Sequence, residues 1–505
     1  MDRGFASMAR GLYLSAQRFP DKPALIEIDR ITLTYAQLLN GCARLAHHLA
    51  GRGVQKGDHV AILSENSVEH IVALYAVAIL GAVSIALDPK WTPYETQRAI
   101  DLFDCRILII DKALEAKGAA LTPGTPPLGV VAYEKHPHSL PLIDDLARDV
   151  RISPLADVKD HDICTIILTS GTTGVPKGVM RSHRNVEIGC MNGVMGKGQT
   201  ETSRELAVVP IFYGSGRGSV IGQIFLGATV YIMPSFDVER CADIIHREAI
   251  TAIALAPTMC WRLLQLPRLE RFGFSSIRSL RKAGSPFPAG MTQEVMTRIT
   301  PNIYQGYAST ETGSVTLLRP HEQLTKPGSS GILEWGVEAE IVDSEGHPVP
   351  AGGEGEICVR GPNVCEGYYR NPEEEARAFR RGWFRTGDLG RFDGDGHLYI
   401  IGRIKDTIKT GSINVSPREI ETQILCMPQI EDVAVVGVPD PEWGEAVKAF
   451  VVLREGQSCG EADVLAHCRS HLAGYKIPKS VAFVEEIERN GLGKVTAEFK
   501  MRARG

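Results

Sequence analysis

Between Leu33 and Leu87 the apolar residues alternate between helical spacing and short continuous runs. Two stretches have helical spacing, LTYAQLLNGCARLAHHLAGRG and EHIVALYAVAILGA, and each is followed by a short apolar run, DHVAIL and VSIAL. Strands that alternate with helices at this spacing predict a parallel sheet covered by helices. The runs CRILIID, TIIL, ATVYIM and AIALAP predict further strands.

A chain of 505 residues is too long for one ordinary hydrophobic core, so we expect at least two domains. Between Gly328 and Leu389, short strands and Gly- and Pro-rich turns such as SEGHPVPAGGEGEICVRG predict a β-rich subdomain. After about Lys405, the order helix, strand, strand, helix, strand predicts a small α+β domain. The predicted fold is α/β: a large N-terminal domain of helix-covered sheets plus the β-rich subdomain (1–401), a hinge (402–405) and a small mobile α+β C-terminal domain (406–505).

Several classes of protein are disfavoured by composition and pattern. The most apolar run, Ile71–Leu87, has 17 residues and contains Gly81, whereas a membrane span needs about 20. We therefore expect a buried helix, a glycine break and a buried strand there. A net charge of -5 argues against nucleic-acid binding. The N-terminus lacks a signal peptide's apolar core, and the cysteines lack metal-ligand spacing, so we expect reduced thiols and a cytoplasmic location.

The segment ILTSGTTGVPKG (Ile167–Gly178) follows an apolar strand with glycines, hydroxyls and one lysine. A Walker A loop needs Gly-Lys followed by Ser or Thr, but Lys177 follows Pro176 and precedes Gly178, so that motif is excluded. Successive Gly and Thr residues can still turn backbone N–H groups inward to bind an anion. From these residues alone, a phosphate-binding loop and a solvated polar turn both remain open.

This loop resembles the glycine-rich loop of the adenylate-forming superfamily, which holds acyl-CoA synthetases, peptide-synthetase adenylation domains and firefly luciferase. Four more segments resemble the superfamily's other motifs, in the same order: YASTETG (Tyr307–Gly313), GWFRTGDLG (Gly382–Gly390), GRIKDTIKTGSINVSPREIE (Gly402–Glu421) and NGLGKV (Asn490–Val495). The resemblance runs from about Thr32 to Lys500 and is strongest to an AMP-forming acyl-CoA synthetase.

The resemblance implies an ATP-dependent acid–thiol ligase. Such an enzyme activates a carboxylic acid, here fatty or aromatic, as acyl-AMP with release of pyrophosphate, and then transfers the acyl group to CoA. Because an anionic carboxylate must attack an anionic phosphate, positive charge, hydrogen-bond donors and Mg²⁺ are expected to offset the repulsion. ATP, Mg²⁺ and CoA are therefore the implied cofactor and co-substrates.

The resemblance also assigns the nucleotide-binding residues. The phosphates are expected to contact Thr169, Ser170, Gly171, Thr172, Thr173, Gly174 and Lys177. Glu311, paired in the motif with Thr310, is expected to hold Mg²⁺; the alternative is an exposed loop carboxylate. Tyr307 is expected to pack on adenine opposite Gly284, Ser285 and Pro286, while Asp388 accepts from the ribose hydroxyls. Arg403 is expected at the ribose or a phosphate, or else as a plain salt-bridge partner.

Two segments near the C-terminus are expected to act in turn. Lys494 is the predicted main catalytic residue, directed at the α-phosphate, although Glu488 stands where many members of the superfamily have proline. Lys405 is the predicted hinge about which the small domain turns. That turn presents Lys494 for adenylation and Gly411, which lines the pantetheine tunnel, for thioester formation; Ser412 replaces a second glycine found in many members.

The segment VPIFYGSGRGSVIGQ (Val209–Gln223) is expected to line the acid site, with Phe212, Tyr213, Gly214 and Ala308 as acyl-pocket residues. Its small residues fit either room for a substrate or tight helix packing. We expect Arg217 at the surface or between domains rather than on a second carboxylate of a diacid. We expect His183 to be structural or to cover a bound acid.

The acid itself is not identified by the sequence. CoA is favoured as acceptor over a separate phosphopantetheinyl carrier protein, and a non-catalytic nucleotide sensor is the alternative from another class. If the chain self-associates, a homodimer is the base-rate expectation.

Overall fold

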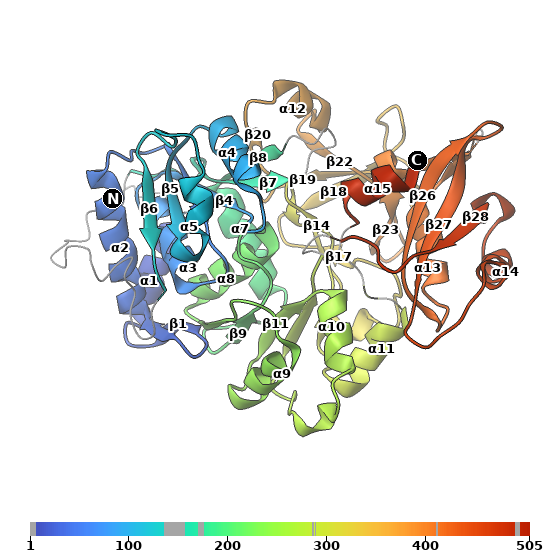
Figure 1. Cartoon of the computed structure of the whole chain (residues 1–505), viewed down its shortest axis with the longest axis horizontal. Coiled ribbons are helices and arrows are strands. Elements are labelled where there is room, and N and C mark those ends of the chain that lie inside the picture. The colour runs from blue at the N-terminus through green and yellow to red at the C-terminus, as the bar shows by residue number, and fades with distance from the viewer. Residues whose placement is uncertain are drawn as a thin grey trace.

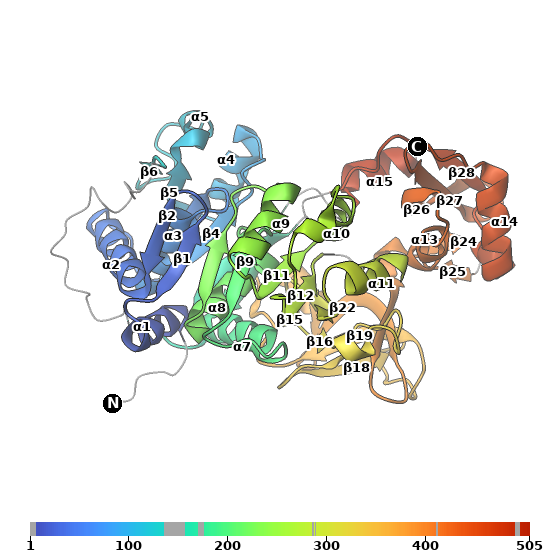
Figure 2. The same ribbon diagram turned by 90° about the horizontal axis from the view of Figure 1, so that it is seen from below.

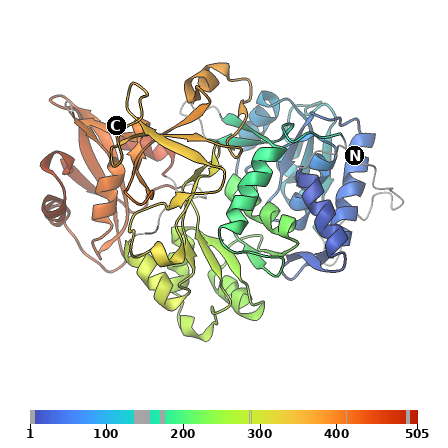
Figure 3. The ribbon, with the colours of Figure 1, turned by 180° about the vertical axis from the view of Figure 1, so that it is seen from behind.

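The structure is a computed structural model that describes residues 7–135, 157–169, 176–284, 287, 289–410, 413–489 and 495–504. Two large sheets and their helices form the N-terminal part, followed by a β-rich part and a small C-terminal part (Figure 1). Figure 3 shows the orange-to-red C-terminal part beside the yellow β-rich strands, on the side away from the blue N-terminal elements.

The first sheet has seven strands. In spatial order they are β13 (Ile303–Tyr304), β12 (Ser279–Lys282), β11 (Ala252–Leu255), β9 (Arg204–Ala207), β10 (Thr229–Ile232), β1 (Pro23–Glu27) and β2 (Ile31–Thr34). All neighbours are parallel except β1 and β2. The predicted parallel sheet is therefore confirmed, with one antiparallel strand at its edge.

The second sheet also has seven strands. In spatial order they are β20 (Gly367–Tyr368), β8 (Lys177–Ser182), β7 (Ile163–Thr169), β4 (Val83–Leu87), β3 (His59–Leu63), β5 (Cys105–Asp111) and β6 (Val130–Tyr133). The strands from β7 to β6 are parallel, whereas β8 is antiparallel to both β7 and β20. The glycine-rich segment therefore joins two antiparallel neighbours.

One layer of helices lies between the two sheets. It contains α1 (Met8–Arg18), α2 (Tyr35–Gly51), α3 (Val68–Ile79), α7 (His183–Met195) and α8 (Gly214–Leu226). Side-chain alternation along the strands explains the layering, because Ile107 and Ile109 of β5 pack on these helices while Leu108 and Ile110 face the opposite side. That opposite face carries α4 (Pro93–Leu102) and α5 (Glu115–Ala119). The outer face of the first sheet carries α9 (Val238–Arg247), α10 (Pro257–Leu264) and α11 (Ala289–Arg298) (Figure 2).

The longest apolar run forms the predicted helix and strand. α3 is buried at every position, Gly81 follows with a φ of 66°, and β4 continues into the second sheet. The side chain of Ser67 accepts a hydrogen bond from the His70 N–H and so caps the N-terminus of α3. In the described part of the chain, no helix combines the length and apolarity that a bilayer crossing needs.

The β-rich part is built on a five-stranded antiparallel sheet. Its strands are β18 (Glu338–Val342), β19 (Gly355–Arg360), β21 (Phe379–Arg380), β22 (Trp383–Phe392) and β23 (Leu398–Arg403), with α12 (Pro372–Ala378) leading into β21. Two small hairpins precede it, formed by β14 (Ala308–Ser309) with β15 (Gly313–Ser314) and β16 (Thr316–Leu317) with β17 (Ile332–Leu333). The predicted β-rich subdomain is confirmed.

The C-terminal part has its own sheet and core, as predicted. Its elements are β24 (Ile408–Thr410), β25 (Ile413–Val415), α13 (Pro417–Ile424), β26 (Ile430–Asp440), β27 (Gly444–Leu453), α14 (Glu461–His471), β28 (Ser480–Phe483) and α15 (Ala497–Arg504). Lys405 lies between β23, the end of the β-rich sheet, and β24, so the change of sheet falls at the predicted hinge. The predicted fold class is confirmed; the domain bounds and the mobility of this part stay predictions.

Candidate active site

The two ends of the glycine-rich segment meet across β7 and β8. Thr169 and Lys177 are the last paired residues of this hairpin, and the Thr169 hydroxyl lies 3.5 Å from the Lys177 carbonyl oxygen. Ser170, Gly171, Thr172, Thr173 and Gly174 lie outside the described residues, so their phosphate contacts stay predictions. The hairpin nevertheless holds Lys177 at a strand end beside that segment.

The Lys177 ammonium is held by residues from another part of the chain. It forms an ion pair with Glu374 of α12 and lies 5.8 Å from the centre of the Tyr368 ring. The Tyr368 hydroxyl donates to Glu311 at 3.2 Å, and burial, reinforced by the Glu311 charge, raises the pKa of this tyrosine. Tyr368 therefore joins the predicted phosphate lysine to the predicted metal carboxylate.

The backbone around Thr310 and Glu311 is anchored by buried polar groups. Arg181 of β8 donates to the carbonyl oxygens of Thr310 and Asn363, both at 2.8 Å, and burial lowers the pKa of its guanidinium. The Cys365 N–H donates to the Glu311 carbonyl at 2.7 Å. These contacts fix the backbone and leave the half-buried Glu311 carboxylate with Tyr368 as its described side-chain partner.

The Glu311 carboxylate suits Mg²⁺ by its chemistry, because that ion prefers hard oxygen ligands and is usually held by one or two carboxylates together with substrate phosphates. Within the described residues, no group of three or more His, Cys, Asp or Glu side chains is arranged to hold a metal ion. A single carboxylate near Lys177, the predicted phosphate lysine, fits the mode of binding in which the nucleotide supplies the remaining ligands.

Tyr307, Asp388 and Arg403 form one connected group. The Tyr307 hydroxyl donates to Asp388 at 2.6 Å, and the Arg403 Nε lies 2.9 Å from the other Asp388 oxygen. Asp388 and Arg403 face each other across β22 and β23, and only 4% of Asp388 is exposed. Burial and the Asp388 charge raise the pKa of Tyr307. Burial opposes the charge on Arg403, but Asp388 and Asp406 outweigh it and raise the pKa of that guanidinium.

The Tyr307 ring packs in the core of the β-rich sheet. Its described contacts are thus those of a buried, hydrogen-bonded tyrosine, and stacking on adenine stays a prediction. Gly284 follows β12 in an exposed position with a φ of 80°, a conformation that favours glycine. Ser285 and Pro286, its predicted companions along adenine, lie outside the described residues.

Positive charge gathers around the predicted hinge. Burial lowers the pKa of Lys405, and the nearby cations Arg403, Lys500 and Lys177 lower it further. Lys500 of α15 lies 3.0 Å from Asp406, so the C-terminal helix meets the chain at the hinge. The chain that follows Lys494 is therefore close to the Lys177 side of the site. Lys494 and Gly411 themselves lie outside the described residues, and their roles stay predictions.

The predicted acyl-pocket segment begins α8. Tyr213 occupies the position before the helix, its ring centre lies 4.4 Å from that of Phe212, and its hydroxyl is 3.5 Å from Asp88. Burial and the Asp88 charge raise the pKa of Tyr213 to about 12. A Cβ on Gly214 would lie 3.2 Å from Ile167, so α8 starts against the strand that leads into the glycine-rich segment. Ala308, the fourth predicted residue, is exposed in β14.

The expectation that Arg217 lies at the surface or between domains is wrong. Arg217 is only 4% exposed, and its guanidinium donates to the Thr165 hydroxyl and the Phe212 carbonyl. Burial lowers its pKa to about 10. Arg217 lies on the side of α8 that faces the second sheet. The Gly- and Ser-rich sequence around it did not indicate this burial.

His183 and Gly216 show structural roles. His183 is fully buried at the start of α7, where its Nδ1 accepts from the Met8 N–H at 3.3 Å. A Cβ on Gly216 would lie 2.3 Å from the Pro210 carbonyl, so tight packing requires glycine there. At Gly218 the nearest atom, the Cys190 Sγ, would be 3.9 Å away, an ordinary contact distance, so close packing does not require glycine at that position.

Sequence reasoning missed Tyr368, Glu374 and Arg181. The motif GYYRNPEEE carries a helix-start signal, because Asn371 caps α12 and a proline follows. That signal predicts a helix, but nothing in it predicts that Glu374 meets Lys177. The same holds for Arg181, whose partners are backbone carbonyls distant in sequence.

Comparisons with known proteins cover nearly the whole chain. A family model described as "AMP-binding enzyme" matches residues 12–369, and one described as "AMP-binding enzyme C-terminal domain" matches residues 419–494. A feruloyl-CoA synthase from an Amycolatopsis species is 35% identical over 466 residues, 92% of each chain. A 2-succinylbenzoate–CoA ligase from Geobacillus kaustophilus is 35% identical over 481 residues, 94% of each chain. The crystal structure of ATP-bound MatB from Rhodopseudomonas palustris superposes with a TM-score of 0.88 at 32% identity, covering 98% of this chain and 99% of that one.

Proposed function

The chain belongs to the AMP-binding enzyme family, and from this premise we propose that it is an AMP-forming acyl-CoA synthetase. It activates a fatty or aromatic carboxylic acid with ATP as acyl-AMP, releases pyrophosphate and transfers the acyl group to CoA. One observation carries the proposal: predicted site residues from distant segments lie together. Tyr368 contacts both Lys177 and Glu311, and Asp388 contacts both Tyr307 and Arg403. Lys405 at the predicted hinge lies near Arg403 and Lys177 and so connects the two groups.

On the phosphate side, Lys177 exchanges its Glu374 partner for the β- and γ-phosphates when ATP binds. Its pair with Glu374 is partly exposed, so it is weak enough to be replaced by a polyanion. Glu311 holds Mg²⁺, which when bound neutralises charge on the phosphates. Tyr368 orients the Glu311 carboxylate by donating to one of its oxygens.

On the ribose side, Asp388 accepts hydrogen bonds from the sugar hydroxyls. Ionised aspartate is an acceptor with two oxygens and about four lone-pair positions, so it can serve the ribose in addition to Tyr307 and Arg403. Lys494 stabilises charge on the α-phosphate as the acid attacks. A turn about Lys405 then replaces Lys494 with the Gly411 segment for thioester formation.

CoA is the proposed acceptor rather than a carrier protein, because several relatives are named CoA synthases or CoA ligases. All eleven cysteines are free, nine of them buried, which supports a reducing compartment such as the cytoplasm.

The proposal is tested by incubating the enzyme with ATP, Mg²⁺, CoA and a panel of aromatic and fatty acids. The expected products are AMP, pyrophosphate and acyl-CoA, and mass spectrometry measures their formation. A second reaction replaces CoA with a phosphopantetheinylated carrier protein. Formation of ADP, or nucleotide turnover that does not depend on the acid, would contradict the proposed function. If the carrier protein is acylated faster than CoA, the carrier protein and not CoA is the acceptor.

A further inference from the structure

The turn between β14 and β15 carries Glu311, the predicted metal carboxylate. Donors from other segments bind the backbone carbonyl oxygens of this turn. Arg181 of β8 donates to the Thr310 carbonyl at 2.8 Å, and the Cys365 N–H donates to the Glu311 carbonyl at 2.7 Å. The backbone at Glu311 is therefore held from outside the turn.

Asn363 extends this set of contacts along the turn. It is fully buried, and its side-chain amide donates to the carbonyl oxygens of Thr312 and Ser314 at 2.7 and 2.8 Å. The Asn363 carbonyl itself accepts from Arg181 at 2.8 Å. Arg181 and Asn363 thus form one connected group that binds the turn before and after Glu311.

The contact between Arg181 and the turn is close. A Cβ on Gly313 would lie 3.1 Å from an Arg181 nitrogen, and Gly313 has a φ of 62°, a conformation that favours glycine. Arg181 also donates to the Asn185 carbonyl at 3.1 Å, so it binds three carbonyl oxygens in all. The planar fork of arginine makes several such bonds in fixed directions, which the single ammonium of lysine does not reproduce.

Arg181 also connects the turn to the predicted phosphate lysine. Strand β8 begins with Lys177 and contains Arg181, and it pairs with β7 on one side and β20 on the other. The bond from Arg181 to Thr310 therefore joins the turn to the strand that positions Lys177. The predicted metal carboxylate and the predicted phosphate lysine are held relative to one another in this way.

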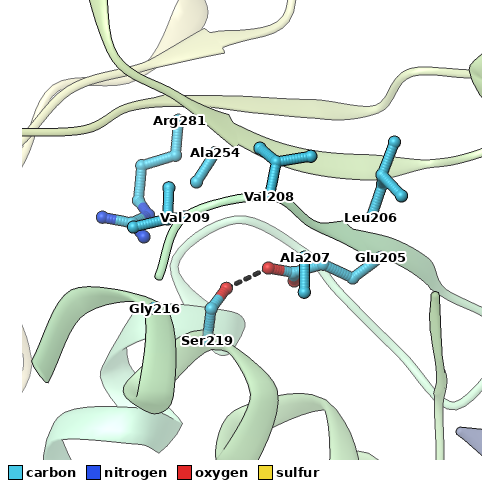
Figure 4. A pocket seen from close by; sticks show the side chains of 9 residues that line it. All are labelled: Glu205, Leu206, Ala207, Val208, Val209, Gly216, Ser219, Ala254 and Arg281. Atoms are coloured by element: carbon cyan, nitrogen blue, oxygen red, sulfur yellow. Dashed lines mark hydrogen bonds between the residues drawn. The ribbon is translucent and has the colours of Figure 1, made fainter. Parts of the chain in front are cut away.

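Arg281 offers a comparison, because it also donates to a backbone carbonyl, that of Ser215, and has no ion pair among the described residues. Arg281 and Glu205 line a cavity of about 10 Å³ (Figure 4). Burial lowers the pKa of Arg281, and the charges of Glu205 and Glu334 oppose that shift. Lys197 belongs to the same cluster, so its cations and carboxylates balance one another.

Arg181 lies in no such balanced cluster. It is only 5% exposed, and no carboxylate of the described residues lies within ion-pair distance of it. Burial lowers the pKa of Arg181, and Glu311 is the carboxylate whose charge opposes that shift. Arg181 therefore acts on Glu311 in two ways, through the backbone of the turn and through its charge.

We propose that Arg181, together with Asn363, is a positioning residue for the magnesium ion that binds with ATP. The two side chains hold the turn so that the Glu311 carboxylate meets the metal ion, and they contact neither the metal ion nor the nucleotide. This inference rests on the proposed function, because it concerns the metal carboxylate of the same site.

The test measures nucleotide binding without turnover. Calorimetric titration with α,β-methylene-ATP gives one Kd in Mg²⁺ and another in EDTA, and the ratio of the EDTA value to the Mg²⁺ value measures the contribution of the metal ion. Arg181→Lys should lower this ratio by about 10-fold, because partners of metal ligands typically contribute 10- to 100-fold to metal affinity. The Kd in EDTA should stay nearly unchanged.

A double-mutant cycle shows whether Arg181 acts through Glu311. In a Glu311→Gln enzyme, Arg181→Lys should have no further effect on the ratio, whereas independent roles would give additive losses. Arg298→Lys is the matched control, because Arg298 also donates to a backbone carbonyl, that of Leu264, on the outer face of the first sheet. It should leave the ratio unchanged.

The outcomes separate this inference from the proposed function. Wild-type nucleotide affinity that does not depend on Mg²⁺ would contradict both the metal role of Glu311 and this inference, whereas acid-dependent AMP formation tests the synthetase function independently. An unchanged ratio in a folded Arg181→Lys enzyme, or additive losses in the double variant, would overturn this inference alone.

A second variant decides if Arg181→Lys does not fold. Asn363→Ser keeps one hydroxyl donor and so cannot bind both the Thr312 and the Ser314 carbonyls. A ratio lowered by about 10-fold in this enzyme would support the proposal, and an unchanged ratio would overturn it.

Discussion

On the nucleotide side of the site, two described cations are paired with carboxylates, Lys177 with Glu374 and Arg403 with Asp388. The buried Arg181 instead donates to backbone carbonyls. On the acyl side, Arg217 and Arg281 donate to a hydroxyl or to carbonyl groups instead. The two sides also differ in how far the sequence reveals them. Contiguous motifs mark the nucleotide side, whereas residues of the other side come together only when β9, α8 and β12 pack against one another.

The difference has a physical meaning. A cation paired with a partly exposed carboxylate can exchange that partner for a phosphate at little cost, because both states are ionic. A buried charge without an ionic partner remains desolvated until some other group meets it. We therefore expect the paired side to bind the phosphates and ribose of ATP and the other side to bind the acid.

The largest expected effect lies on the nucleotide side. Lys494→Ala should lower adenylate formation by about 10²- to 10³-fold, or roughly 3–4 kcal/mol, because a donor aimed at transition-state charge is lost. Thioester formation from a supplied acyl-adenylate should be largely spared. Measuring both half-reactions tests this, with Lys479→Ala, an exposed lysine of the same part of the chain, as control. Equal loss of both half-reactions would contradict two alternating domain positions.

Asp388→Asn should lower kcat/KM for ATP by about 10- to 100-fold, since hydrogen bonds to charged groups contribute about 1.5–3 kcal/mol each. The substitution removes the charge that faces Arg403 and weakens the bond from Tyr307. Titration of ATP at saturating acid measures the effect. The control is Asp393→Asn, which removes a carboxylate paired with Lys326 after β22. An unchanged kcat/KM for ATP in Asp388→Asn would contradict a role of Asp388 in nucleotide binding.

A third prediction separates His183 from the acyl side. Burial lowers its pKa from 6.5 to about 4, so the unfolded chain binds the extra proton first as the pH falls. Stability that is present above pH 6.5 should therefore be lost between pH 6.5 and 4, by up to about 3 kcal/mol. Denaturant unfolding of the wild type and His183→Gln across that window measures the loss, which should be smaller in the variant.

The exposed His161 offers the control, because His161→Gln should reproduce the wild-type pH dependence. A His183→Gln enzyme with wild-type pH dependence of stability but an altered acid preference would instead place His183 over the bound acid.

The smallest effect tests the partner exchange of Lys177. Glu374→Gln should lower the KM for ATP by about 1.5- to 5-fold, because exposed ion pairs contribute about 0.2–1 kcal/mol. Glu373→Gln, one residue earlier on α12 and exposed, is the control. A higher KM in Glu374→Gln would mean that Glu374 assists ATP binding, and the comparison between paired and unpaired charges would fail on this side.

Much of the fold could be predicted from the sequence because its signals are local. The apolar run of α3, the break at Gly81 and the strand β4 follow from spacing and one glycine. The order of elements after Lys405 follows in the same way. The antiparallel placement of β8 could not be predicted, because strand direction depends on the sheet partner and not on the pattern within the strand.

The site residues also divide into those that local sequence could predict and those that depend on packing. Glu311, Asp388 and Arg403 stand in contiguous motifs, so resemblance could name them. Arg217 was misjudged because its neighbours are small and polar, whereas its burial is decided by Thr165 on another strand. No motif marks Glu205 or Arg281 in the sequence. Each stands beside a second charged residue, Arg204 in β9 and Lys282 in β12, and only packing brings the two side chains to one cavity.

The claim that the nucleotide side and the acyl side act separately is tested most directly by pyrophosphate–ATP exchange in the wild type and Asp388→Asn. Each enzyme is measured with the same panel of acids, and two quantities are compared: the kcat/KM for ATP and the order of the acids by kcat/KM. The account predicts a kcat/KM for ATP lowered by about 10- to 100-fold and an unchanged order of the acids. An unchanged kcat/KM for ATP together with an altered order of the acids would contradict it.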